Sequence, residues 1–348
     1  MRMPGLHVKN MLLTVSALTA SLFMIIMLPS CEKVFMKEDA RVDPETIFEE
    51  VWSFTNDHYS FFELKGIDWD EAYSRFRPLV RPDINPVELF DICAAMLYEL
   101  RDGHVNLVSP FDRSRYWEWY LESPENFNYP IIERSYYQQN QRLIGPLEFI
   151  NLNDIIYIYY PSFASAISKN DLDIVMTNLE GKKGLILDVR NNGGGSIVNA
   201  KRIISRLTDE KRLLGHNFVK TGPGHNDFRK EDIYVEPYNG RRFTGDVVVL
   251  TNRRSYSATT YFTQYMKALP NVTVIGDVTG GGGGIPAFYD LANGWLLRVS
   301  SSRFYSPSGA DIESGVSPHI KVDMTKASMD EEKDDILEKA IEILSEGK

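Results

Sequence analysis

Cysteine is scarce in this chain, whose 348 residues include only Cys31 and Cys93. A fold stapled by disulfides is therefore excluded, because such scaffolds carry several cysteine pairs. Cys93 lies in the apolar stretch LFDICAAMLYEL, and we expect it to be a buried thiol. The sequence also has no H-E-x-x-H pattern and no closely spaced cysteine pair, so we expect neither a metal nor an organic cofactor.

Positive charge is also in short supply. Lysine and arginine number 38 against 48 aspartates and glutamates, which gives a formal net charge of −10 at pH 7. The chain offers no basic run and no base-stacking module. Nucleic-acid binding depends on clustered lysine and arginine that neutralise phosphates, so we expect no nucleic-acid partner.

The most apolar segment, residues 11–28, is short for a membrane span and follows two basic residues, which is typical of a secretory signal. It ends in LPSC, which resembles a lipobox, although Cys31 could instead be a small buried residue. We expect residues 1–30 to be a lipoprotein signal peptide, Cys31 to carry lipid and residues 31–42 to be a tether. Lipid would hold the protein on a membrane surface of the bacterial cell envelope, and we expect this to be the outer membrane.

Beyond the tether, the pattern of the sequence divides the chain into three stretches. Residues 43–108 predict a helical N-terminal subdomain, whose helices begin near Asp43, Asp68 and Asn85. Residues 109–148 predict an irregular, aromatic-rich connection. Residues 149–345 predict an α/β core with a largely parallel sheet, because short apolar runs alternate with helical patterns and an amphipathic helix ends the chain.

Two serines, Ser255 and Ser257, lie where the expected strand at residues 246–252 turns into a helix. A helix start presents unpaired N–H groups, so a serine here could be a nucleophile beside an anion site. It could equally be an ordinary N-cap, and no G-x-S-x-G elbow distinguishes the two. The glycines at residues 193–195 likewise predict either an oxyanion-binding or phosphate-binding loop or a tight strand-to-helix turn.

The histidines and a second glycine run leave similar alternatives. His104 follows a helix end, where it could be catalytic or could interact with the helix dipole. His225 and His319 are candidates for substrate contact or for structural roles. The glycine-rich stretch at residues 279–286 lacks the ending of a phosphate loop and predicts a flexible loop or lid.

Five motifs in order give a more specific signal: LRDGHVNL, GLILDVRNNGGGSI, VVVLTNRRSYSATTYF, VIGDVTGGGGG and RFYSPSGADIESGVSPHI. Together they resemble the tail-specific, or C-terminal processing, serine proteases, and in particular the core of tricorn protease. The resemblance spans about residues 43–344. It implies an α/β fold with a crotonase-like (ClpP/crotonase) core and a protein or peptide substrate.

The resemblance also implies roles for individual residues. Ser257 matches the family's nucleophile, and Ser255 is then a turn residue. A lysine-based branch would need a lysine where this chain has Gly282, whereas His104 and Glu313 match the base and carboxylate of the tricorn-like branch. The backbone N–H groups of Gly194 and Ala258 would hold the oxyanion.

Some family features are missing and two other functions remain open. Gly103 stands where the tricorn core has a serine, and residues 105–149 are too few for the PDZ domain that most members carry. A non-catalytic ligand-binding or peptide-binding surface lipoprotein on the same scaffold is the main alternative. An acyl-CoA-handling crotonase-type enzyme is a third, disfavoured by the secretion signal.

Overall fold

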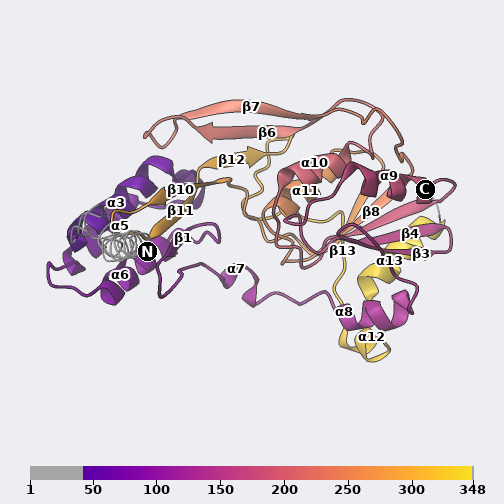
Figure 1. Ribbon diagram of the computed structural model, residues 1–348, viewed down its shortest axis with the longest axis horizontal. Coiled ribbons are helices and arrows are strands. Elements are labelled where there is room, and N and C mark those ends of the chain that lie inside the picture. The colour runs from indigo at the N-terminus through magenta and orange to yellow at the C-terminus, as the bar shows by residue number, and fades with distance from the viewer. Residues whose placement is uncertain (1–41, 347–348) are drawn as a thin grey trace, which may run out of the picture.

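The computed structural model describes residues 42–346, so the expected signal peptide, Cys31 and nearly all of the expected tether lie outside the described residues. Figure 1 shows a smaller helical part, a larger α/β part and a long β-hairpin that runs across both. Among residues 42–346, no helix is both long and apolar enough to cross a membrane.

The helical part is built by capped, amphipathic helices. Asn85 accepts hydrogen bonds from the N–H groups of Val87 and Glu88, both at 3.0 Å, and Asp68 caps its helix in the same way. The first helix begins directly after Asp43, as the sequence predicts, but the side chain of Asp43 makes no such bond. The helical elements are α3 (Pro44–His58), α4 (Phe62–Lys65), α5 (Trp69–Phe76), the 3-10 turn η1 (Arg77–Leu79) and α6 (Pro86–Tyr98).

Cys93 is buried in α6, as the apolar sequence around it predicts. Burial disfavours the thiolate and raises the pKa of this thiol to about 12. Cys93 is therefore a packing residue and is not poised as a nucleophile.

A small antiparallel sheet completes the helical part with residues from far along the chain. Its order is β1 (Asn106–Val108), β11 (Leu296–Ser300) and β10 (Pro286–Asp290). Leu107 and Leu297 are register partners, and both are buried in the apolar cluster that includes α3 and α6. Residues 286–300, which we expected in the α/β core, therefore lie with the N-terminal helices.

The α/β class is confirmed by a seven-stranded mixed sheet. Its five strands from β13 to β4 are parallel to their neighbours. β3 pairs antiparallel with β4, and β2 pairs antiparallel with β3. β2 lies within residues 109–148, so the sheet begins earlier than we expected, with a tight turn at Gly145. In order, the strands are β13 (Ile320–Lys321), β9 (Val272–Gly276), β8 (Asp246–Thr251), β5 (Gly184–Asp188), β4 (Ile155–Tyr159), β3 (Leu147–Leu152) and β2 (Arg142–Ile144).

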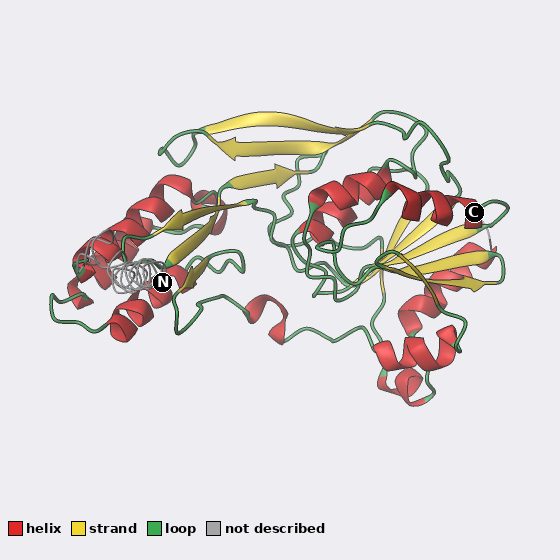
Figure 2. Ribbon diagram, viewed as in Figure 1, coloured by secondary structure: helices red, strands yellow, loops and turns green. Residues whose placement is uncertain are grey.

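Helices cover both faces of this sheet, as Figure 2 shows, so its central strands are apolar on both sides. Leu187 packs on one face with α9 (Lys169–Asn178), α10 (Ile197–Ile204) and α11 (Ala258–Lys267). Ile186 packs on the other with the π-helical turn η2 (Ile132–Tyr137) and α13 (Asp335–Glu346). The remaining short helices are α7 (Glu118–Leu121), α8 (Tyr129–Ile131) and α12 (Lys326–Asp330).

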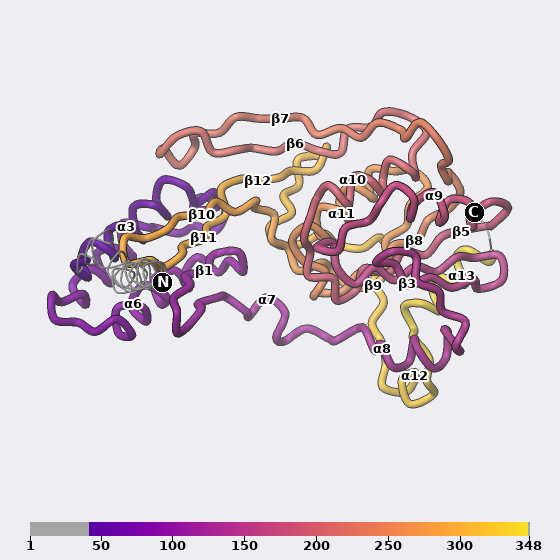
Figure 3. The backbone as a smooth tube through the Cα atoms, viewed as in Figure 1, coloured from indigo at the N-terminus to yellow at the C-terminus, as the bar shows by residue number. Residues whose placement is uncertain are grey.

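A long β-hairpin runs along both the helical part and the α/β part, as the tube in Figure 3 shows. It consists of β6 (Arg212–Lys220) and β7 (Phe228–Val235), and β12 (Ser302–Tyr305) pairs with β6. At its tip, the His225 ring lies 3.0 Å from Asn56 Oδ1, and Asn226 donates to Glu63. These contacts connect the tip to α3 and α4.

A buried ion network joins the end of β5 to the start of α13. The guanidinium of Arg190 lies 2.6 Å from Asp188 and 2.8 Å from Asp334, and all three side chains are fully buried. Asp334 also caps α13 by accepting from Leu337 N–H, and Tyr157 donates to Asp188. Because every member has several partners, the desolvation cost of the charges is offset only while the network is complete.

We predict that Arg190→Met lowers the free energy of unfolding by about 3–5 kcal/mol, because two buried carboxylates would lose their cation. Urea unfolding at pH 7 measures the change. Arg134→Met is the matched control, since its ion pair with Glu332 is exposed and should contribute about 1 kcal/mol or less. Equal effects of the two substitutions would contradict the assigned role of the network.

Candidate active site

Ser257 occupies a strained position between β8 and α11. Its φ of 58° and ψ of −121° place a non-glycine residue in a sparsely populated conformation, of the kind that clusters at functional sites. Its hydroxyl does not cap α11, so the ordinary N-cap alternative does not describe this serine. Ser257 N–H donates to the Gly281 carbonyl at 2.9 Å, and this hydrogen bond helps to keep the backbone in the strained conformation.

Ser255 has a different environment. Its hydroxyl is buried, donates to the Val189 carbonyl at 2.8 Å and accepts from Asn252 N–H at 3.1 Å. The first bond joins the turn after β8 to the end of β5, and the second closes the turn itself. Ser255 is therefore a structural turn residue.

The glycine loop that follows β5 approaches Ser257 closely. A Cβ at Gly194 would lie 2.8 Å from Ser257 Cβ and 2.9 Å from Ala258 N, so only glycine lets the loop pack against the start of α11. Ala258 N–H has no hydrogen-bond acceptor among the described residues. Gly194 N–H, the other expected donor, is bonded to Asn192 Oδ1 at 3.0 Å.

Asn192, for which sequence analysis predicts no role, supports this arrangement. Its side chain accepts from Gly194 N–H and from the Thr259 hydroxyl at 2.9 Å, and it donates to the Tyr160 carbonyl at 2.8 Å. The amide thereby fixes the glycine loop against the first turn of α11. No pattern in a single sequence separates this asparagine from Asn191 beside it.

His104 is buried at the edge of the helical part, near the residue that precedes Ser257. Its ring meets the Tyr256 ring edge-on, with centroids 4.9 Å apart, and its Nδ1 has no partner among the described residues. Burial lowers the pKa of His104 to about 4, and Arg298 and Arg115 act in the same direction while Asp102 opposes them. His104 is therefore neutral at pH 7.

Glu313 does not contact His104, although we expected it to orient that ring. Its carboxylate accepts from Lys65 Nζ at 2.7 Å and from Gly283 N–H at 2.8 Å. Burial and the nearby Asp102 raise the pKa of Glu313 to about 7, against the opposing effect of Lys65. An ammonium satisfies this buried carboxylate better than a neutral imidazole does.

Lys65 and Asp102 are site residues that sequence reasoning missed. Lys65 Nζ lies 3.9 Å from Asp102 Oδ2. The other carboxylate oxygen of Asp102 accepts from the backbone N–H of His104 at 2.7 Å. Burial disfavours the charged form of Lys65, but Asp102 and Glu313 outweigh it and raise the pKa of the ammonium. Lys65 is therefore protonated and is a poor general base.

The glycine run at residues 279–286 is packed, which corrects our expectation of a flexible loop or lid. Most of its residues are buried, and Tyr261 donates to the Gly283 carbonyl at 2.6 Å. A Cβ at Gly282 would lie 2.6 Å from the Tyr256 ring, so the absence of side chains lets this backbone pass between Tyr256 and Glu313.

The other candidate histidines lie in structural contacts. His225 belongs to the hairpin tip described above and packs against the Phe62 ring at 4.6 Å. His319 Nδ1 accepts from Val274 N–H at 3.0 Å and so extends the edge of the main sheet. Among residues 42–346, no group of three histidine, cysteine or acidic side chains is arranged to hold a metal ion.

The lowered pKa of His104 predicts how stability changes with pH. The His104 ring takes up a proton less readily in the folded protein than in the unfolded chain. Its titration therefore leaves the free energy of unfolding unchanged above pH about 6.5 and lowers it as the pH falls toward 4. Between pH 7 and pH 4 the wild type should lose up to about 3 kcal/mol more than His104→Asn, which cannot titrate. Urea unfolding at both pH values measures this, and parallel losses would contradict the assignment.

Comparison with known proteins adds the family context. Residues 154–322 match Peptidase family S41, and residues 40–98 match the Tricorn protease C1 domain. The chloroplastic C-terminal processing peptidase of Tetradesmus obliquus is 32% identical over 145 residues, which is 41% of this chain and 30% of that protein. Tricorn protease of Thermoplasma volcanium is 26% identical over 255 residues, which is 70% of this chain and 21% of that protein.

One solved structure matches this chain over nearly all of its own length, unlike the two curated relatives above. The crystal structure of a candidate peptidase from Parabacteroides merdae is 42% identical, with a TM-score of 0.83, and the match covers 87% of this chain and 97% of that one. The chain spans less than a third of the two curated relatives above. Together the matches confirm the resemblance predicted from the five motifs.

Proposed function

Because the chain belongs to Peptidase family S41, whose relatives include serine proteases, we propose that it is a serine endopeptidase that hydrolyses protein or peptide substrates. The observation that carries this proposal is the conformation of Ser257. Its backbone is strained, its hydroxyl caps no helix, and the unbonded N–H of Ala258 and the closely packed glycine loop at Gly194 lie beside it. An ordinary cap residue would need none of these features.

In the proposed reaction, Ser257 Oγ attacks the scissile carbonyl and His104 accepts its proton. The tetrahedral oxyanion accepts a hydrogen bond from Ala258 N–H, and Gly194 N–H becomes a second donor when it is released from Asn192. His104 then returns the proton to the leaving amine, and water repeats the sequence on the acyl-enzyme. Neither a metal nor an organic cofactor has a role in these steps.

The proposed Ser-His-Glu triad must assemble from the described arrangement. Glu313 is held by Lys65, and Tyr256 lies against His104. Hydrogen bonds of this kind are often incomplete before substrate binds. We place the approach of Glu313 to His104 in the substrate complex, where the carboxylate would raise the pKa of the imidazole and make it a stronger base.

The finer fold class is part of the same proposal. The glycine loop after β5 and the start of α11 after β8 meet at the carboxyl end of neighbouring parallel strands. This arrangement supports a crotonase-like core, in which backbone N–H groups from two such segments stabilise an oxyanion.

Replacement of each serine tests the nucleophile. Ser257→Ala should lower casein cleavage by about 10⁴-fold to 10⁶-fold and abolish labelling by a fluorophosphonate probe. Ser255→Ala should keep labelling and cost about tenfold or less in rate, although its lost hydrogen bonds should lower stability by about 1–2 kcal/mol. The reverse ranking would place the nucleophile at Ser255.

The same assay separates the alternative function. A wild-type protein that binds peptides but is neither labelled nor active would support the non-catalytic binding lipoprotein. The unassembled contact between His104 and Glu313 is the observation that keeps this alternative under test.

We also propose that Cys31 is lipidated and that the lipid anchors the protein at the cell envelope, in the outer membrane. Support comes only from the apolar run that ends in LPSC, outside the described residues. Cys31→Ala should move the protein from the membrane fraction to the aqueous phase in detergent partitioning. Unchanged partitioning would contradict the anchor.

A further inference from the structure

Three buried hydrogen-bond donors beside the candidate nucleophile have no acceptor. Arg115 Nε, Trp119 Nε1 and Arg298 Nε are all without a partner among the described residues. Buried donors are almost always paired, so a group of orphans in one place needs an explanation. All three are donors, and the missing partner is therefore an acceptor.

These side chains gather at one place through β1. Arg298 is the register partner of Asn106 and donates to its side chain at 3.2 Å. Ser114, next to Arg115, accepts from Leu107 N–H through its hydroxyl at 2.9 Å. The pairing on β1 thus places Arg115 and Arg298 on chain segments that flank the same short strand.

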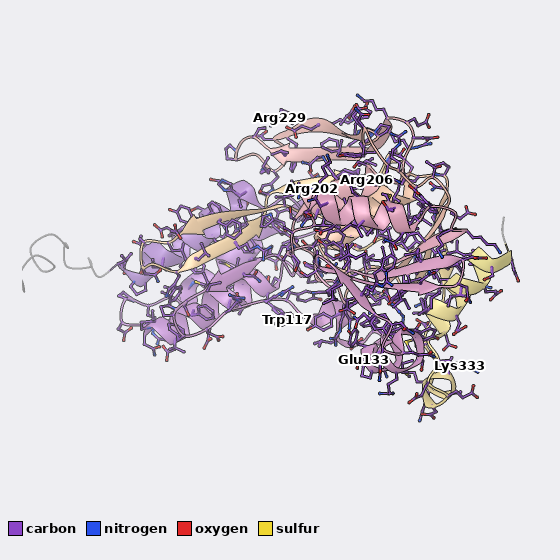
Figure 4. The ribbon with its side chains drawn as sticks, turned by 45° about the vertical axis from the view of Figure 1, so that its right-hand side comes forward. Trp117, Glu133, Arg202, Arg206, Arg229 and Lys333 are labelled. Atoms are coloured by element: carbon purple, nitrogen blue, oxygen red, sulfur yellow. The ribbon has the colours of Figure 1, made fainter. Side chains whose placement is uncertain are left out.

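The group adjoins Ser257 through Tyr256. The Trp119 indole stacks on the Tyr256 ring with centroids 4.3 Å apart, and the Arg115 guanidinium lies 5.8 Å from the centre of that ring. Figure 4 shows the neighbouring Trp117 between the helical part and the α/β part. A ligand of this group would therefore lie next to the proposed reacting atoms.

The positive charge in this group is not neutralised. Among residues 42–346, no carboxylate lies within ion-pairing distance of Arg113, Arg115 or Arg298. Asp102 attracts Arg298 from further away. Its Oδ1 accepts from the backbone N–H of His104, and its buried Oδ2 lies 3.9 Å from Lys65 Nζ without accepting a hydrogen bond. The group thus holds two arginines without a carboxylate partner in a chain whose formal net charge is −10.

Arg115 is stacked in a way that leaves the edge of its guanidinium for hydrogen bonding. The guanidinium of Arg115 stacks on the Trp117 ring at 4.0 Å, so an aromatic face covers its plane. The N–H groups of a guanidinium point outward in that plane, in the fork that matches the two oxygens of a carboxylate.

We propose that Arg115, Arg298 and Trp119 form a carboxylate-binding subsite that selects substrates with an acidic group close to the scissile bond. This inference rests on the proposed function, because it names the substrate class of the same site. The carboxylate could belong to an aspartate or glutamate side chain or to the free C-terminus of a peptide.

Binding to the Ser257→Ala variant tests the subsite without cleavage. The probes are fluorescein-labelled alanine hexapeptides with a single Glu or Gln at each position in turn, and each is made with a free or an amidated C-terminus. Fluorescence anisotropy should show about 10-fold to 100-fold tighter binding for the carboxylate member of one pair. A Glu-over-Gln preference identifies a side chain, and a preference for the free over the amidated peptide identifies the terminus.

Substitutions then assign the preference to the arginines. Arg115→Gln and Arg298→Gln, each added to Ser257→Ala, should reduce the preference to about twofold or less while the uncharged peptides bind as before. Arg298→Lys should keep part of it, because charge remains but the fork is lost. Arg229→Gln on the hairpin, labelled in Figure 4 and paired with Glu231, is the control and should change nothing.

No carboxylate preference in the parent, or an undiminished preference in both glutamine variants, would overturn the subsite. Thermal unfolding of each variant shows whether a lost preference merely reflects lost folding, and the charge-retaining Arg298→Lys provides the second reading. The outcome is separable from the proposed function. An arginine-dependent preference without hydrolysis by the Ser257-containing protein would keep the subsite and reject the peptidase, whereas hydrolysis without a preference would do the opposite.

Discussion

The fully buried ion network around Arg190 is the constraint on which the rest of the α/β part depends. It neutralises Asp188 at the end of β5 and Asp334 at the start of α13. The loop of Asn191, Asn192 and the three glycines follows directly, so any displacement of Arg190 moves the backbone that faces Ser257. The position of the candidate site is thus set by a charge cluster that contacts no reacting atom.

The strain at Ser257 is sustained by polar contacts on both sides of it. Ser255 is bonded to the end of β5, Asn192 joins the glycine loop to α11, and the Gly281 carbonyl holds Ser257 N–H. A φ of +58° costs a non-glycine residue on the order of 1–3 kcal/mol, and several buried hydrogen bonds of about 1 kcal/mol each offset it. In this conformation the Ser257 hydroxyl does not cap α11 and so remains available for reaction.

Sequence reasoning reached the parts that depend on local periodicity and failed where distant segments meet. The capped helices at Asp68 and Asn85, the central parallel strands and the burial of Cys93 each follow from patterns of a few residues. The pairing of β1 with β11 brings together residues almost 200 positions apart, and the ion pair of Lys65 with Glu313 joins residues 248 apart. No single sequence specifies such pairs, because loop closure and packing decide them.

The same limit explains the error about the glycine run. The glycines at residues 280–284 predict a mobile loop, since glycine has the most conformational freedom to lose on folding. In the fold they permit close packing, because a side chain there would collide with Tyr256, Trp119 or the Glu313 backbone. Whether glycine signals mobility or close approach depends on neighbours that lie far away in the sequence.

Electrostatics ties the proposed subsite to the proposed base. Burial lowers the pKa of His104 to about 4, and Arg298 and Arg115 add to this effect, so the imidazole is neutral but only weakly basic. A substrate carboxylate bound by the arginines would remove their part of the effect and raise the pKa of His104, although burial would still hold it below its ordinary value. The base would then gain some strength when a substrate of the right charge is present, in addition to the effect of Glu313. Selectivity would therefore enter through the proton-transfer step as well as through binding.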